Sequence, residues 1–323
     1  MKILVTGGAG FIGSHLCERL LLSHHEVTCI DNFSDFYNPI IKERNIISIS
    51  KFPNFSLQKV DITDYKASES IFMKKNFDLV IHLAAMAGVR PSIENPLYYN
   101  EVNVKGTLNL LELCRIFSIK KFIFSSSSSV YGNNKKVPFS EEDSVDFPIS
   151  PYAMTKKAGE LLCHTYHILH DMSIICLRLF TVYGPRQRPD LAIHKFTDLI
   201  MNGKEIPLYG KGETERDYTY IDDVIDGFIS TIEYIFIGKK FQIFNLGSSN
   251  TISLSQMIEV IEKVLKIKAK KLIMSKQPGD VERTYADISK SHKYLNYNPK
   301  TAFEEGIIKF IEWKELSKFS NIK

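Results

Sequence analysis

The sequence predicts an α/β fold: a doubly wound parallel sheet with helices on both faces, and a smaller C-terminal α/β lobe. Short apolar runs alternate with helical stretches through the first half of the 323 residues, which is typical of a parallel sheet. After residue 180 the segments become shorter and more mixed, which indicates the second lobe. The chain is long enough to bury one large core.

The expected elements follow from this alternation. Strands of the large sheet are expected at residues 2–6, 26–30, 55–60, 78–82, 121–126 and 173–178. Beyond them we expect a loop over 183–189, a helix ending near residue 202, and short strands at 206–209 and 216–220. A helix over 222–236 and a strand over 242–245 are expected to return to the large sheet, so that the two lobes interleave in sequence.

A glycine-rich turn follows the first expected strand. The apolar run 2–6 leads into Gly7, Gly10 and Gly13, and the next helix opens at Phe11. Gly7 permits a tight turn, Gly10 lets the backbone approach a phosphate, and Gly13 lets the helix sit close to the sheet. The first N–H groups of such a helix point at a pyrophosphate. The turn therefore predicts a dinucleotide site in a sheet of Rossmann type.

An acidic residue stands at the end of the second expected strand. Asp31 lies about twenty residues beyond the glycines, where a carboxylate accepts hydrogen bonds from the adenosine ribose. A carboxylate there also repels the 2′-phosphate that distinguishes NADP from NAD. We therefore expect NAD as the cofactor. The competing interpretation is that Asp31 is only a turn residue at a strand end.

Charge and cysteine content argue against several classes of protein. The net charge is +4 and no basic cluster is interleaved with aromatic side chains, so we expect no nucleic-acid partner, and the lysine-rich run 266–271 is expected to be a solvated helix end. Five cysteines within expected elements, without C-x-x-C spacing, predict neither disulfides nor a metal site. The chain starts in a core strand and has no membrane-spanning apolar run, so we expect it in the cytoplasm.

A run of serines ends the fifth expected strand, at the sheet edge where such folds bind ligands. Tyr152 and Lys156 follow on one face of an expected helix. A neighbouring ammonium and the positive nicotinamide ring stabilise a phenolate and lower the pKa of Tyr152. The phenolate then takes a proton from an alcohol held by a serine hydroxyl, while hydride leaves for the nicotinamide. Tyr152, Lys156 and a serine of this run are therefore the candidate catalytic residues.

With these motifs in this order, nearly the whole chain resembles the extended short-chain dehydrogenases/reductases of the nucleotide-sugar epimerase group. The resemblance implies an NAD-binding domain at 1–180 plus about 222–246, and a UDP-sugar-binding lobe at 181–221 and 247–323. In that family the positions matching Ser127, Tyr152 and Lys156 form the catalytic set. The expected cofactor contacts are Gly7, Gly10, Phe11, Ile12, Gly13, Asp31, Asn32, Phe33, Asp61, Ile62, Leu83, Ala84, Ala85, Asn103, Ser125, Tyr152, Lys156 and Phe180.

The resemblance also implies where a sugar nucleotide binds. Arg216 resembles the arginine that grips the diphosphate of a UDP-sugar, and a uracil site is implied near Pro207 and Tyr209. Gln277 stands at one position of the family's second diphosphate arginine, and Arg283 is the expected substitute.

Three features bear on the sugar. Segments 86–92 and 178–185 resemble those of UDP-glucuronate 4-epimerases. The expected hydroxyl donors to a C6 carboxylate are Ser128, Ser129 and Thr181, with Arg90 or Arg188 adding charge, while Ser127 contacts the substrate as a catalytic residue. Related dehydratases and decarboxylases carry carboxylates where Ser128 and Ser129 stand, which disfavours those reactions here. We therefore expect UDP-glucuronate and UDP-galacturonate to interconvert by oxidation at C4, rotation of the 4-keto sugar and return of hydride, with NAD held tightly and recycled.

Other interpretations stay open. Thr284 stands where strict UDP-glucose epimerases have a bulky tyrosine, so there is room for an N-acetyl group, and UDP-glucose or UDP-N-acetylglucosamine is the alternative substrate. A sensor that binds NAD without turnover is disfavoured because the candidate catalytic residues are all present. A homodimer is expected through helices at 97–118 and 151–170, whose apolar residues include Leu108, Leu111, Leu161 and Tyr166.

Overall fold

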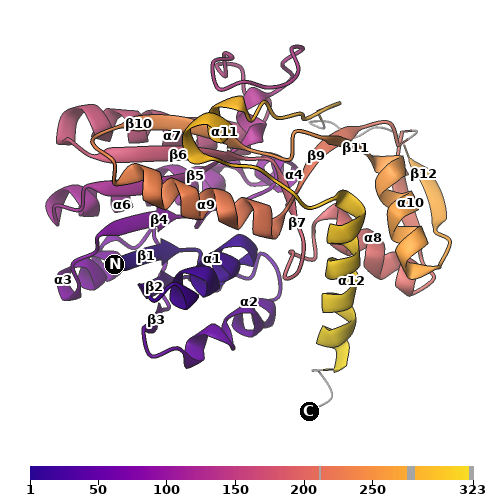
Figure 1. Ribbon diagram of the computed structural model, residues 1–323, viewed down its shortest axis with the longest axis horizontal. Coiled ribbons are helices and arrows are strands. Elements are labelled where there is room, and N and C mark those ends of the chain that lie inside the picture. Colours follow the sequence, from indigo (N-terminus) through magenta and orange to yellow (C-terminus); the bar gives the residue numbers. More distant parts are fainter. Residues whose placement is uncertain (211, 275–280, 320–323) are drawn as a thin grey trace.

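A seven-stranded sheet forms the centre of the protein (Figure 1). The computed structural model describes residues 1–210, 212–274 and 281–319. Every strand pair of the large sheet is parallel. The order across it is β3 (Phe55–Gln58), β2 (Glu26–Ile30), β1 (Lys2–Thr6), β4 (Leu79–His82), β5 (Lys121–Ser127), β6 (Ser173–Leu179) and β10 (Phe241–Leu246). The predicted fold class is confirmed.

Helices cover both faces of this sheet. On one face α1 (Phe11–Leu22) packs against α9 (Ile221–Ile235), and on the other α6 (Gly106–Ile116) packs against α3 (Tyr65–Lys74) and α7 (Pro151–His170). The start of α7 is encoded locally, because the Ser150 hydroxyl accepts a hydrogen bond from the Ala153 N–H and Pro151 occupies the first turn. This cap fixes the orientation of the helix turn that carries Tyr152.

Shorter elements connect the framework. Among the described residues, seven short helical segments lie between the longer elements. They are α2 (Pro39–Ile46), η1 (Ile49–Lys51), α4 (Val89–Glu94), α5 (Pro96–Asn100), η2 (Glu101–Lys105), η3 (Ser128–Tyr131) and α11 (Ser289–Leu295). The segment η2 is a π-helical turn that joins α5 to α6. Such turns are frequent at functional sites.

The smaller lobe lies beside the sheet and contains α8 (Ala192–Met201), α10 (Leu254–Leu265) and α12 (Phe303–Phe319) (Figure 1). It also holds two small sheets, β11 (Thr251–Ser253) with β9 (Glu215–Tyr220) and β7 (Thr181–Tyr183), and β12 (Lys270–Met274) with β8 (Glu205–Tyr209). Strands β7, β11 and β12 were not expected from the sequence. They are short and pair with distant segments, so their own residues carry little strand signal.

The lysine-rich run 266–271 requires a correction. It is not a helix end throughout: α10 ends at Leu265, Lys266 takes a left-handed conformation with φ of 56°, and Lys270 and Lys271 begin β12. Pairing with β8 offers these last lysines backbone hydrogen bonds that a frayed helix end does not.

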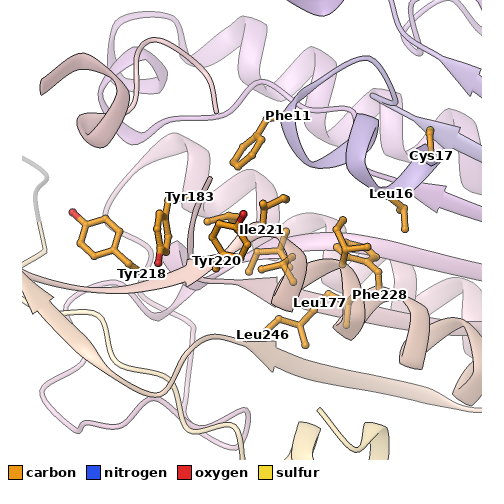
Figure 2. Packing of buried hydrophobic residues seen from close by; sticks show 14 of the residues in the cluster. Phe11, Leu16, Cys17, Leu177, Tyr183, Tyr218, Tyr220, Ile221, Phe228 and Leu246 are labelled. Atoms are coloured by element: carbon orange, nitrogen blue, oxygen red, sulfur yellow. The ribbon is translucent and has the colours of Figure 1, made fainter. Parts of the chain in front are cut away.

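The two lobes share one core. A continuous cluster of buried apolar side chains runs from Ile3 of β1 through Phe228 of α9 to Phe310 of α12. Figure 2 shows Tyr183 standing between Tyr218 and Tyr220, with ring centroids 6.2 and 5.7 Å away. The smaller lobe is therefore held against the sheet by apolar contact.

Across the described residues, no helix is both long and apolar enough to cross a bilayer, and no three His, Cys, Asp or Glu side chains are grouped to hold a metal ion. The five cysteines are buried and none forms a disulfide.

Candidate active site

A cavity of about 380 Å³ opens at the carboxyl ends of the large sheet's strands. All the expected cofactor residues line it except Phe33 and Asn103. They come from the turn after β1, the segments that follow β2, β3, β4 and β6, the end of β5, and the first turns of α7. Parallel strands bring their carboxyl ends to one edge, which places these segments together. Segments more than one hundred residues apart in sequence therefore meet in one cavity.

The glycine turn is packed too tightly for side chains. Gly7 has φ of 70°, which favours glycine. A Cβ at Gly13 would lie 2.1 Å from the Gly7 carbonyl oxygen, whereas a Cβ at Gly10 would lie 3.2 Å from it. The close partner of Gly13 is thus the turn itself, rather than the body of the sheet. No side chain caps the start of α1, so its first N–H groups face the cavity edge, as a pyrophosphate requires. The cradle therefore fits a dinucleotide.

Asp31 is tied to its surroundings by several contacts. Its carboxylate accepts hydrogen bonds from the N–H groups of Ala9, at 3.2 Å, and Phe33, at 2.9 Å. The ammonium of Lys42 lies 3.2 Å from the same carboxylate, and both side chains are largely buried. Asp31 therefore organises the glycine turn in addition to facing the cavity. Lys42 also lines the cavity and was missed by sequence reasoning, because nothing local links α2 to the end of β2.

Two expected cofactor residues lie outside the cavity lining. Phe33 is buried with φ of 52°. Asn103 is 2% exposed in the π-helical turn, where its amide exchanges hydrogen bonds with the backbone of Met86 and donates to the Thr155 hydroxyl. Both side chains are buried, and the Asn103 amide is engaged by internal hydrogen bonds.

The three candidate catalytic residues lie together on the cavity wall. Ser127 ends β5, and its hydroxyl oxygen accepts a hydrogen bond from the Ser129 N–H at 3.1 Å. Tyr152 lies in the first turn of α7, and the Ser127 hydroxyl acts to lower the pKa of its phenol. The ammonium of Lys156, one turn later, donates to the Ser125 carbonyl oxygen at 2.6 Å. The serine and the phenol are therefore placed to share one substrate hydroxyl.

The electrostatics of this set differ from the sequence expectation. Burial raises the pKa of Tyr152 above its usual value of 10, and the Ser127 hydrogen bond and the charge of Arg188 oppose that shift. Burial lowers the pKa of Lys156 from 10.5 to about 8. The expected lowering of the phenol pKa is thus not produced by the chain's own charges. Arg188 is the cation that acts on the phenol, while the ammonium faces a peptide oxygen.

Hydroxyl and guanidinium donors stand beside the catalytic set. Ser128, Ser129, Thr181 and Arg188 all line the same cavity. Arg188 forms a two-pronged contact with Asp190, at 2.9 and 2.6 Å, and its guanidinium lies 5.2 Å from the ring centroid of Phe36. Its side chain is only 17% exposed. The arginine is therefore fixed in the wall rather than moving freely in solvent.

The loop that carries Arg188 is fastened to α1. His15 is hydrogen-bonded to the Pro185 carbonyl oxygen at 2.9 Å, and Arg186 donates to Glu18 at 2.6 Å. The helix at the glycine turn and the loop of the smaller lobe are therefore held as one unit.

The residues expected at the uridine diphosphate lie elsewhere. Tyr209 and Arg283 line a second cavity of about 730 Å³ between β8 and the loop after η3. The guanidinium of Arg90 lies 5.0 Å from the Tyr209 ring centroid, and Arg283 forms an ion pair with Glu215. Pro207 and Arg216 line neither of these two cavities. Gln277 lies outside the described residues.

Thr284, the residue expected to leave room for an N-acetyl group, lies beside β9. It is 7% exposed and lines neither cavity. Its hydroxyl accepts a hydrogen bond from the Asp217 N–H at 3.2 Å, and its own N–H donates to the Glu215 carbonyl oxygen. Its segment pairs with the edge of β9 through Arg283 and Glu215.

Comparisons with known proteins cover nearly the whole chain. Residues 4–310 match the family described as GDP-mannose 4,6 dehydratase. The UDP-glucuronate 4-epimerase of Thermodesulfobacterium geofontis is 43% identical over 313 residues, which is 97% of this chain and 95% of that protein. The structure of UDP-glucuronic acid 4-epimerase from Bacillus cereus, in complex with UDP-glucuronic acid and NAD, has a TM-score of 0.89 at 39% identity and covers 98% of this chain and 100% of that one.

A structure of UDP-glucose 4-epimerase from Thermotoga maritima with UDP-glucose has a TM-score of 0.90 at 32% identity, covering 98% of this chain and 100% of that one. The resemblance inferred from the motifs is thereby confirmed. The chain belongs to the GDP-mannose 4,6 dehydratase family of extended short-chain dehydrogenases/reductases, in its nucleotide-sugar epimerase group.

Proposed function

We propose that this protein is an NAD-dependent UDP-sugar 4-epimerase that interconverts UDP-glucuronate and UDP-galacturonate. The observation that carries the proposal is the cavity itself, where Ser127, Tyr152 and Lys156 lie beside a glycine cradle and a wall of hydroxyl and guanidinium donors. The similar protein from Bacillus cereus is described with UDP-glucuronic acid and NAD in place.

The residues have distinct tasks in such a reaction. When bound, NAD would supply a hydride acceptor and donor for the sugar C4. Ser127 holds the C4 hydroxyl, and Tyr152 removes its proton on oxidation and returns one on reduction. Lys156 holds positive charge behind the phenol, and Arg188 acts directly on it. No second substrate is needed to restore the cofactor.

A uronate places an extra demand on the site. Its 4-keto form is a β-keto acid, which can lose carbon dioxide, so the carboxylate must be held in an orientation that disfavours C–C cleavage. Ser128, Ser129 and Thr181 are the proposed restraints, with Arg188 adding charge. The two serine positions offer no carboxylate for elimination or decarboxylation.

The decisive experiment compares three substrates. The purified protein is incubated separately with UDP-glucuronate, UDP-glucose and UDP-N-acetylglucosamine, and products are separated by anion exchange. Galacturonate from the first alone is the expected result. Turnover of either neutral sugar in preference to the uronate would replace the substrate assignment, and the similarity to a UDP-glucose epimerase makes that the second candidate. NAD binding with no turnover of any UDP-sugar would indicate a sensor instead.

We propose that the two expected regions of the chain bind different ligands. Residues 1–180 and about 222–246 bind NAD, because β10 pairs within the large sheet and α9 packs on α1. Residues 181–221 and 247–323 bind the UDP-sugar, with Arg216 and Arg283 on the diphosphate and Pro207 and Tyr209 at the uracil. Five free, buried cysteines favour a reducing compartment, the cytoplasm.

We also propose a homodimer through α6 and α7. Met154, Leu161 and Ile168 recur every seven residues along α7 and are 41, 57 and 60% exposed, and Leu108 of α6 is 37% exposed. An apolar stripe of this kind favours burial against a second copy. Leu111 and Tyr166, which the sequence placed on the same surface, instead face the protein's own core.

A further inference from the structure

A buried ion pair lies beneath the catalytic residues. Arg178 of β6 is 1% exposed and Glu160 of α7 is 2% exposed. The guanidinium donates from Nε to Oε1 and from Nη2 to Oε2 of the carboxylate, both at 2.9 Å. The hydroxyl of Ser126, on β5, donates to the same Oε1 at 2.6 Å. One carboxylate therefore joins β5, β6 and α7.

Two members of this cluster adjoin a catalytic residue, and the third pairs with one of those two. Ser126 precedes Ser127, and Glu160 follows Lys156 by one helical turn. Arg178 pairs in register with Ser126 across β5 and β6. A movement of α7 along the sheet would break the carboxylate contacts and, at the same time, separate Tyr152 from Ser127.

Stability is a poor explanation for this pair. Desolvation of two buried charges offsets much of their attraction, and apolar residues of similar volume often replace such pairs without loss. Arg178 also has an Nη1 atom without a hydrogen-bond partner among the described residues, and its guanidinium lies 4.8 Å from the ring centroid of Tyr131. What the pair does supply is geometry, because a two-pronged contact fixes both distance and angle.

The carboxylate also acts on Lys156, which is 4% exposed. The ammonium is faced by Glu160 and Cys163 from its own helix, by His82 from β4, and by the Ser125 carbonyl oxygen and Phe124 ring from β5. Burial lowers the pKa of Lys156 to about 8, and the Glu160 carboxylate opposes that shift. His82 adds no charge, since burial lowers its pKa to about 3.

We propose that Glu160 is a positioning residue for hydride transfer: its carboxylate, held by Arg178, fixes the end of β5 against α7 and keeps a negative charge beside the Lys156 ammonium. The inference rests on the proposed function, because it assigns Glu160 a task in that reaction. Two separable effects follow. The position of the Glu160 carboxylate sets the distance between Ser127 and Tyr152. Its charge influences the pH at which the Lys156 ammonium loses its proton.

The test measures kcat and KM across pH, using the NAD-loaded protein and whichever UDP-sugar the wild type turns over. E160D keeps the charge but withdraws it from Ser126, so kcat is expected to fall about tenfold while the alkaline limb of the kcat profile stays in place. The double variant E160Q/R178M removes both charges together, which avoids an unpaired buried arginine. In the double variant kcat is also expected to fall about tenfold. The alkaline limb of its kcat profile is expected to move about one pH unit lower. KM and NAD content should stay within twofold of the wild type.

A matched control separates this role from general destabilisation. Glu262 of α10 is also buried and accepts from Lys268 and the Ala269 N–H, both at 2.9 Å, but lies in the other lobe. E262Q is expected to lower Tm without changing kcat or its pH profile. If the double variant does not fold, S126A is measured in its place. Its kcat is expected to fall while the alkaline limb of the kcat profile stays where it is in the wild type.

The outcomes are distinct. Wild-type kcat and pH profile in the double variant, or in S126A if it must serve alone, would overturn the inference while leaving the proposed function intact. Absence of wild-type turnover with every UDP-sugar would overturn the proposed function and this inference with it.

Discussion

Replacing Gly13 with alanine is expected to damage the fold and the NAD site together. The new Cβ would lie 2.1 Å from the Gly7 carbonyl oxygen, 2.7 Å from Gly8 Cα and 2.9 Å from the Gly7 carbonyl carbon. All three are backbone atoms of the turn that leaves β1, so no side-chain rotation relieves the contact. The turn must move away from α1 by about 1 Å to restore ordinary van der Waals spacing.

The size of the effect follows from this overlap. Overpacking a tight interior costs about 1–3 kcal/mol, and contact with three backbone atoms places G13A at about 3 kcal/mol. For a chain of this size each kcal/mol lowers Tm by about 2 °C, so a loss of about 6 °C is expected. Loss of bound NAD would lower Tm further by mass action, so Tm is measured with and without saturating NAD.

Gly10 provides the matched control. Its Cβ would meet only the Gly7 carbonyl oxygen, at 3.2 Å, and its φ of −71° suits alanine. G10A is expected to hold the apo Tm to within about 2 °C of the wild type. It should nevertheless lose most of its NAD, because the methyl group enters the space that the pyrophosphate needs. NAD content is measured by chromatography after denaturation. A G13A protein with wild-type Tm and full NAD content would refute the account of the turn.

Three further predictions concern the sugar, the cofactor and the assembly. T181A should raise the fraction of UDP-pentose by-product, because the carboxylate loses one restraint, and unchanged product ratios by anion exchange would count against that role. D31N should shift the ratio of NADP to NAD affinity by at least about tenfold toward NADP, because Lys42, 3.2 Å from Asp31, loses its countercharge and meets a 2′-phosphate. Adding K42M should cancel the gain, and a gain that persists would show that Lys42 is not its source. L161E should convert the dimer to a monomer in sedimentation experiments, whereas L22E, at a position 60% exposed on α1, should not; a dimer that survives L161E would exclude the α7 stripe.

The strands of the large sheet were predictable because each one is encoded by its own residues. Short apolar runs bounded by helical stretches placed six of them within two residues of their observed ends, and β10 was placed correctly as a returning strand. Strands β7, β11 and β12 were missed, because their pairing depends on partners far away in sequence.

The candidate site shows the same division. The sequence predicted that four site residues lie close together: Gly7, Asp31, Ser127 and Tyr152. The reason is that a parallel sheet gathers the carboxyl ends of its strands at one edge. Nothing in the sequence indicated that the Asn103 amide would bind the Met86 backbone instead of a ligand. The one available signal for Glu160 was its i+4 spacing from Lys156, which shows a shared helix face but not the partner.

The sequence by itself determined the fold class, the dinucleotide turn and the set of residues that meet at the strand ends, because local spacing and the geometry of parallel sheets suffice for these. Only the tertiary structure decided which charges meet: Lys42 with Asp31, and Arg178 with Glu160. Ion pairs form wherever packing brings distant segments together, and burial then sets the pKa values. Neither is recorded in the order of residues along one strand or helix.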